Sequence, residues 1–129
     1  MSKPILVLDF DGVLHSYTTP WLAPDHIPDP PVTGALRFMQ QALEHFRVAV
    51  FSSRSHEPRG IEAMQTWLAH WANEQSKHLD DVDHSWLNEI EWPTVKPPAF
   101  LTIDDRAIMF TGTWPAIADL KAFKPWNKT

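Results

Sequence analysis

Two carboxylates separated by one residue, Asp9 and Asp11, are the side chains of this sequence best suited to chemistry. They directly follow the apolar run at residues 5–8, and Gly12 comes next. A continuous apolar, partly β-branched run of this kind predicts a strand buried on both faces, as in a parallel sheet. Open α/β sheets bind ligands at the carboxyl ends of their strands, and glycine lets the backbone turn sharply there. We therefore expect Asp9 and Asp11 to line a cleft.

Two acids this close repel each other, and burial in a cleft raises the cost unless protons or a cation neutralise them. Mg²⁺ suits such a sparse site, because it prefers one or two carboxylates together with waters and phosphate oxygens. The alternative is that the Asp9–Asp11–Gly12 pattern is only a polar turn after a strand, since Asp and Gly are common turn residues.

Length and composition predict one compact domain over residues 1–129. The chain is 43% hydrophobic and 21% charged, which is ordinary for a globular protein. A formal net charge of −5 argues against a nucleic-acid binder with a broad basic surface. The absence of cysteine and the shortness of the first apolar run, which fits neither a signal peptide nor a membrane span, predict a cytoplasmic protein with no membrane partner.

Residues 15–32 contain five prolines, too many for a regular helix or a central strand. This segment is expected to form an ordered flap that begins beside the two carboxylates and covers the cleft. Tyr17 and Trp21 are either aromatic contacts for a substrate or anchors that hold the flap to the domain, and the second interpretation is favoured.

The middle of the chain predicts a β-helix-β unit. Apolar residues recur at helical spacing over residues 33–45, and residues 48–51 form a second apolar run, so a parallel pair of strands is expected. The second strand ends in Ser52, Ser53 and Arg54, and a further helix is expected from about Ser55, with Pro58 in its first turn. Three histidines in this region, His70, His78 and His84, match no compact metal motif.

Polar residues follow a third apolar run in the same way. Residues 100–103 predict a strand that leads into Asp104, Asp105 and Arg106. Residues 90–93 are expected to form a short edge strand cut off by proline, and residues 108–110 a last strand. A terminal helix over residues 115–123 should turn Ile117 and Leu120 inward.

Taken together, these elements resemble the haloacid dehalogenase-like (HAD) superfamily of phosphotransferases. The resemblance covers nearly the whole chain and rests on four signals in order: the Asp9 to Leu14 motif, a serine after the second strand, Lys96, and Asp104–Asp105 after a later strand. It implies an α/β fold, a Rossmann-like three-layer arrangement of a mainly parallel sheet between helices.

The resemblance also implies roles for individual residues. Asp9 would be the nucleophile that forms an aspartyl-phosphate, and Asp11 the general acid and base. Mg²⁺ would be held by the Asp9 side chain, the backbone carbonyl of Asp11 and Asp105, with Asp104 as a second ligand or outer partner. Ser52 and Lys96 would stabilise the phosphoryl oxygens.

Plainer interpretations stand beside these roles. Ser52 can be a strand-end hydrogen bond, Lys96 a surface cation and Asp104 a turn cap. Substrate contacts are expected from Ser53, Arg54 and Arg106, but a structural salt bridge to one of the acids is an equal alternative for the two arginines. His15 lies four residues after Asp11 and is a candidate contact for the substrate or the flap, but a loop histidine without a catalytic role is favoured.

Neither interval between the motifs is long enough for a full cap domain, so the resemblance implies a capless member with an open site. The leading function is a magnesium-dependent phosphatase acting on a phosphorylated small molecule or macromolecular end, alone or as an oligomer. One alternative is a polynucleotide 3′-phosphatase, which a local basic groove near residues 52–59 would favour. Another is a non-catalytic phosphate-binding interaction module.

Overall fold

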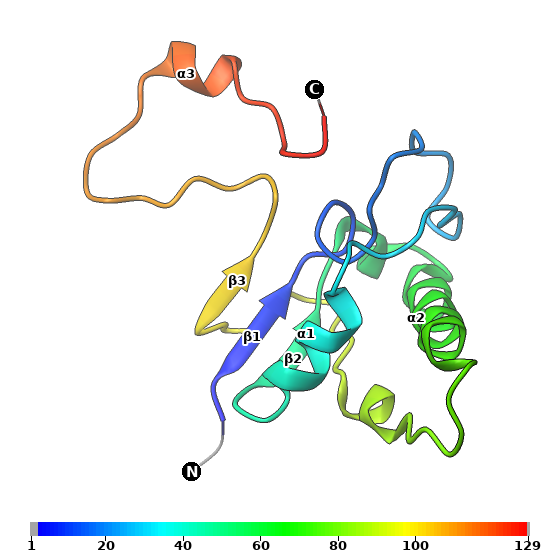
Figure 1. Ribbon diagram of the computed structural model, residues 1–129. Coiled ribbons are helices and arrows are strands. Elements are labelled where there is room, and N and C mark those ends of the chain that lie inside the picture. Colours follow the sequence, from blue (N-terminus) through cyan, green and yellow to red (C-terminus); the bar gives the residue numbers. More distant parts are fainter. Residues whose placement is uncertain (1–2, 129) are drawn as a thin grey trace.

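The fold is built around a three-stranded parallel sheet, seen in a computed structural model that describes residues 3–128. The strands are β1 (Ile5–Leu8), β2 (Arg47–Val50) and β3 (Leu101–Ile103), in the spatial order β2-β1-β3 (Figure 1). The central place of β1 explains its continuous apolar run, because both of its faces and both of its edges are covered. The expected strands at residues 5–8, 48–51 and 100–103 are therefore confirmed to within one residue.

Two helices flank this sheet. They are α1 (Ala35–Ala42), between β1 and β2, and α2 (Gly60–Ser76), between β2 and β3. Strands β1 and β2 and both helices share one buried cluster, which includes Leu6, Leu8, Val48, Val50, Leu36, Met39, Met64 and Leu68. Because the four strand residues of this set alternate along β1 and β2, they lie on one face of the sheet. The chain forms a small α/β domain with a parallel sheet flanked by helices.

The start of α2 differs from the sequence prediction. Instead of beginning near Ser55 with Pro58 in its first turn, the chain makes a short 3₁₀ helix, η1 (Ser53–His56), before α2. Two reciprocal hydrogen bonds close this turn: the Ser52 hydroxyl accepts from the Arg54 N–H, and the Ser55 hydroxyl accepts from the Ser52 N–H. Helix α2 starts after Arg59. The φ of Arg59 is 63°, a left-handed conformation, and it separates η1 from α2.

The expected edge strand at residues 90–93 is reduced to one bridge. Glu91 pairs in parallel with Ala49, through backbone hydrogen bonds to Val48 and Val50. The side chains of Arg47 and Glu91 form a double hydrogen bond of 2.9 and 2.7 Å across the same edge. The segment that precedes it holds a second short 3₁₀ helix, η2 (Ser85–Glu89).

Two predictions for the C-terminal part of the chain were wrong, although its helix was predicted correctly. Residues 108–110 form no strand, and Met109 is 83% exposed. The terminal helix exists as α3 (Ile117–Lys121), but Ile117 and Leu120 are both exposed rather than inward. Figure 1 shows the reason: after β3 the chain leaves the sheet on an extended arm, so these apolar residues have no strand or core to pack on.

Residues 15–32 form the ordered flap that the prolines predicted. Its base is closed by a bridge between His15 and Pro31 and by a hydrogen bond from the Ser16 N–H to the Pro30 carbonyl. The indole of Trp67 on α2 donates to the carbonyl of Asp29, which ties the flap to the helical side of the domain. Among the described residues, no helix combines the length and apolar character needed to cross a membrane.

Candidate functional site

The polar residues that follow the three strands meet at one edge of the sheet. All strands are parallel, so their carboxyl ends lie together there. A cleft of about 360 Å³ opens at this edge, and it is lined by Asp9, Asp11, Tyr17, Trp21, Ser52, Ser53, Asp105 and Arg106. The cleft therefore collects most of the residues that the sequence singled out, and it also contains the two flap aromatics.

Three carboxylates come together inside this region. Oxygen atoms of Asp9, Asp104 and Asp105 all lie within 4.8 Å of one another. Burial raises the pKa of Asp9 to about 8; the backbone N–H of Phe10 opposes this, while the neighbouring charges of Asp104 and Asp105 add to it. The pKa of Asp105 is also raised, mainly by burial. Burial and, to a smaller extent, mutual repulsion therefore disfavour the ionised form of Asp9 and Asp105 in this cluster.

The chemistry of this cluster fits a hard divalent cation. All three donors are carboxylate oxygens, the type that Mg²⁺ prefers. The Oδ1 atom of Asp105 is buried and has no hydrogen-bond partner, which is costly for a carboxylate unless a positive charge faces it. The Oδ1 atom of Asp104 accepts the Arg106 N–H at 2.8 Å, so Asp104 also makes the turn expected as its plainer role.

Gly12 sets how closely Asp105 approaches β1. Its φ is 82°, a left-handed conformation that favours glycine, and a Cβ there would overlap the Asp105 carboxylate. The Gly12 carbonyl in turn accepts a hydrogen bond of 2.8 Å from the indole of Trp126. The absence of a side chain at this position is therefore what allows the third carboxylate into the cluster.

Asp11 points into a different environment from Asp9, although only one residue separates them. The guanidinium of Arg54 donates to both carboxylate oxygens of Asp11, at 2.9 and 3.1 Å, and His15 lies 2.9 Å from Oδ1. Burial pushes the pKa of Asp11 upward, but the hydrogen bonds from His15 and Arg54 outweigh it and lower the pKa. Asp11 is thus held as a carboxylate beside the cleft.

Arg54 is fixed by the flap as well as by Asp11. Its side chain is 1% exposed, and Nη1 donates to the backbone carbonyls of Ala23, Pro24 and His26. Of the two alternatives for Arg54, a substrate contact or a salt bridge to an acid, the structure shows the salt bridge. The segment after β2 therefore also holds the flap in place.

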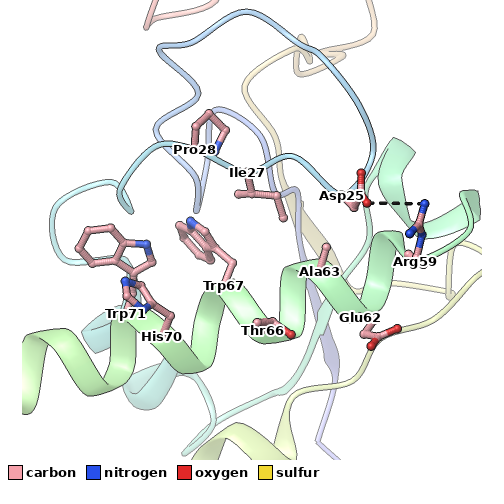
Figure 2. Close-up of a pocket in the computed structure, with 10 residues that line it drawn as sticks. All are labelled: Asp25, Ile27, Pro28, Arg59, Glu62, Ala63, Thr66, Trp67, His70 and Trp71. Atoms are coloured by element: carbon pink, nitrogen blue, oxygen red, sulfur yellow. Dashed lines mark ion pairs between the residues drawn. The ribbon is translucent and has the colours of Figure 1, made fainter.

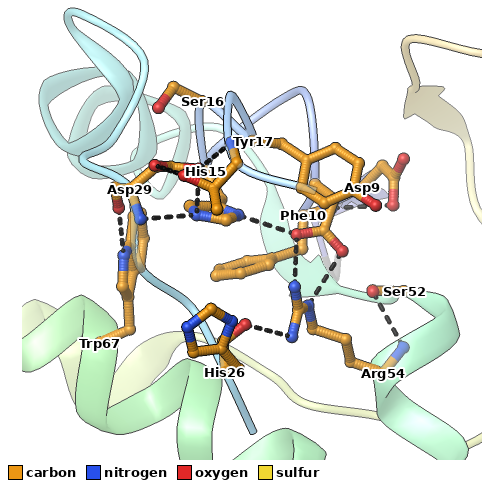
Figure 3. A network of polar contacts seen from close by, with 12 residues as sticks. Asp9, Phe10, His15, Ser16, Tyr17, His26, Asp29, Ser52, Arg54 and Trp67 are labelled. Carbon is orange, nitrogen blue, oxygen red and sulfur yellow. Dashed lines mark hydrogen bonds and ion pairs between the residues drawn. The ribbon is translucent and has the colours of Figure 1, made fainter. Parts of the chain in front are cut away.

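His15 is a completely buried link between Asp11 and the flap (Figure 3). Its Nε2 accepts the backbone N–H of Asp29 at 3.1 Å, so the ring proton lies on Nδ1 and is donated to Asp11. Asp29 is itself held by the Thr19 N–H and hydroxyl. Of the alternatives for His15, the structure shows the contact with the flap, together with a hydrogen bond to Asp11.

The remaining expected residues lie around the same cleft. The hydroxyl of Ser52 accepts the Arg54 N–H at 3.0 Å, which leaves its own proton free for donation. Ser53 and Arg106 are exposed on the cleft wall. Lys96 lines an adjoining cavity of about 200 Å³ together with Asp9, Ser52 and Asp104, so it reaches the same edge from the opposite side.

The sequence did not predict the roles of three residues at this site. The positioning roles of His15 and Asp29 were not anticipated, although the four-residue spacing from Asp11 to His15 across a turn was a usable signal. The C-terminal contact was missed altogether: Lys128 donates to the Tyr17 carbonyl at 3.1 Å. It joins residues more than a hundred positions apart, which no local pattern reveals.

A second cavity, of about 530 Å³, lies between the flap and α2 (Figure 2). An ion pair of 3.8 Å between Asp25 and Arg59 closes one end of it. Trp67 and Trp71 from α2 form much of the remaining wall. None of the residues expected to handle a phosphoryl group lines this cavity, and most of them line the smaller cleft instead.

Fold and site together define an α/β domain with a carboxylate cluster at the carboxyl edge of a parallel sheet. Comparison of the chain with models of known protein families, with curated proteins and with solved structures gave no match.

We predict that Gly12→Ala weakens magnesium binding without touching a ligand, because the new Cβ displaces Asp105 from the cluster. The loss should be roughly tenfold or more in affinity, as for other residues that orient ligands. The measurement is the rise in melting temperature that added Mg²⁺ produces. The control is Gly34→Ala, which has a similar φ of 84° but no neighbour within 4 Å. Equal magnesium responses in the two variants would contradict this account of Gly12.

We also predict that the metal-free protein loses stability as the pH rises from about 4 to about 8. In this range the folded protein keeps a proton on Asp9 that the unfolded chain has lost, because the pKa of Asp9 rises from 3.8 to about 8 on folding. Asp9→Asn should flatten this slope and stabilise the protein at the upper end. Urea denaturation in the presence of a chelator measures it, and parallel pH profiles for variant and wild type would refute the prediction.

Proposed function

We propose that this protein is a magnesium-dependent phosphatase of the HAD-like type, with a Rossmann-like three-layer fold and an aspartyl-phosphate intermediate. One observation carries the proposal: Asp9 belongs both to the three-carboxylate cluster and to the cleft that Ser52 and Arg106 line. A carboxylate in this position can face a phosphoryl group while its charge is shared with a cation. If Asp9, Asp11 and Gly12 formed only a polar turn after β1, no carboxylates from the end of β3 would need to lie beside Asp9.

In the first half-reaction, a carboxylate oxygen of Asp9 attacks phosphorus and the bond from phosphorus to the substrate oxygen breaks. The hydrogen bond of 2.8 Å from the Phe10 N–H to Oδ1 fixes the Asp9 side chain, so the attack needs little reorganisation. The departing oxygen takes a proton from Asp11 on the wall of the same cleft; because Asp11 is ionised in the resting protein, it must first take up this proton from solvent.

In the second half-reaction, water attacks phosphorus, the bond from phosphorus to Asp9 breaks, and inorganic phosphate leaves. The proton of the attacking water passes to Asp11. The ion pair with Arg54 and the hydrogen bond from His15 keep Asp11 ionised, so it has a free site for this proton; its lowered pKa means that it passes the proton on to solvent readily. Arg54 and His15 therefore act through Asp11 and do not bind the phosphoryl group.

Charge compensation comes from the surrounding donors. When bound by Asp9, Asp104 and Asp105, magnesium would neutralise the charge between the carboxylates and the phosphoryl oxygens. Three further groups would stabilise the charge on the phosphoryl oxygens. They are the hydroxyl proton of Ser52 and the exposed cationic side chains of Lys96 and Arg106.

The polynucleotide 3′-phosphatase alternative receives no support from residues 52–59, all of which lie in the described part of the chain. Within this segment Arg54 is buried against Asp11, and Arg59 lies 3.8 Å from Asp25 at the other cavity. These arginines therefore do not form the local basic groove that would favour a polynucleotide.

We predict that Asp9→Asn lowers turnover of phosphate monoesters by at least about 10³-fold, because it removes the nucleophile. Wild-type protein incubated with substrate and quenched in acid should carry phosphate on the peptide that contains Asp9, and excess chelator should abolish turnover. Mass spectrometry of the digested protein and a phosphate-release assay measure these effects.

The matched control is Asp25→Asn, which removes an exposed acid that lines the other cavity. It should turn over substrate at the wild-type rate. Near-wild-type turnover by Asp9→Asn, or full activity of the wild type in chelator, would overturn the proposed function.

A further inference from the structure

Two aromatic side chains of the flap, Tyr17 and Trp21, share the cleft with the acid cluster. Trp21 is 45% exposed, although an indole gains most from burial. A large aromatic surface left open inside a polar cleft indicates a surface that a ligand can cover. A role as an anchor for the flap would explain why one face of the Trp21 ring is covered, but it does not explain why the rest of the ring is exposed.

The covered face of Trp21 lies against a fixed cation. The guanidinium carbon of Arg54 is 4.4 Å from the centre of the Trp21 ring. Arg54 is buried and bound by Asp11 and by flap carbonyls, so it cannot follow a mobile ring. The indole is therefore pre-organised, and covering its open face would cost little conformational entropy.

Tyr17 is held with similar rigidity by the C-terminal residues. Its φ of 55° is unusual for a side chain of this size, and Lys128 compensates by donating to the Tyr17 carbonyl at 3.1 Å. The Lys128 ammonium also lies 4.7 Å from the centre of the Tyr17 ring. Asn127 donates to the neighbouring carbonyl of Ser16, so two hydrogen bonds from the C-terminal residues hold the base of the flap.

We infer that Trp21 and Tyr17 bind the planar group of the substrate, and that the substrates are nucleoside phosphates. The inference rests on the proposed function, because it places the phosphoryl group at Asp9. A nucleobase has the flat π surface that stacks on an indole, and every base can do so. The cleft of about 360 Å³ has the size of a small-ligand site.

The charge of the cleft favours a single nucleotide over a long chain. Arg106 is the one cationic side chain among the residues that line this described cleft, and Arg54 is neutralised by Asp11. A polynucleotide would need further cations along its backbone. Affinity beyond the phosphoryl group must therefore come from stacking on the flap.

The test compares adenosine 5′-monophosphate with ribose 5-phosphate, which has the same phosphate ester and no base. With the full chain and Mg²⁺, kcat/KM should be higher for the nucleotide. Trp21→Ala should lower kcat/KM for the nucleotide roughly tenfold or more and change it for ribose 5-phosphate less than about twofold. Trp21→Phe should retain most of the preference, because it keeps a stacking ring.

The control is Leu22→Ala, since Leu22 is the next flap residue, is 72% exposed and does not line the cleft. It should behave like the wild type with both substrates. A 5′-phosphorylated dinucleotide forms another arm. The free nucleotide should be preferred, because Arg106 is the one cation among the described residues that line the cleft; a preference for the dinucleotide would overturn the assignment to single nucleotides.

Equal losses for both substrates in Trp21→Ala would overturn this inference and leave the phosphatase function intact. No turnover of any substrate would instead overturn the phosphatase function. In that event, calorimetric titration with adenosine 5′-monophosphate still decides the stacking: wild type should bind it more tightly than Trp21→Ala does, and equal affinities would refute the contact.

Discussion

Repulsion among three carboxylates is the constraint around which this small domain is arranged. Parallel pairing of β1 with β3 brings Asp9, Asp104 and Asp105 within 4.8 Å of one another. Burial raises the pKa of both Asp9 and Asp105, and the neighbouring carboxylates add to this effect, so the ionised cluster is unfavourable without a compensating positive charge. Natural proteins keep such strain mainly at functional sites, which is the physical reason to interpret the sheet edge as a metal site.

Asp9 and Asp11 show how neighbouring acids acquire opposite properties. Asp9 faces other carboxylates and its pKa rises, whereas Asp11 faces Arg54 and His15 and its pKa falls. Without a cation Asp9 therefore keeps its proton at neutral pH while Asp11 is ionised, so the nucleophilic role proposed for Asp9 requires a bound cation that lowers its pKa. The arginine that sets the Asp11 environment also holds the flap and lies against Trp21, so one buried cation connects this acid to the flap aromatic.

Much of the fold and the location of the site could be predicted from sequence. Continuous apolar runs identified β1 and β2, helical spacing identified α1 and α2, and the polar residues after each strand identified the common edge. These signals are local, and the parallel pairing follows from them. All three residues of the acid cluster could accordingly be predicted from the sequence.

Other features depend on distant parts of the chain and left no local signal. Apolar residues 108–110 looked like a strand, but a strand needs a partner edge, which the arm after β3 does not find. The burial of Arg54 depends on flap carbonyls about thirty residues away. The same limit applies to Lys128 and Tyr17, whose contact joins the C-terminal residues to the flap.

Calorimetric titration with Mg²⁺ tests the central claim most directly, by comparing wild type with Asp105→Asn and Asp11→Asn. Because Asp105 belongs to the cluster and the Asp11 carboxylate does not, Asp105→Asn should weaken binding at least about tenfold. Asp11→Asn, with its fold checked by circular dichroism, should bind the metal nearly as tightly as wild type. The opposite ranking, or equal binding by all three proteins, would contradict a metal site built from Asp9, Asp104 and Asp105.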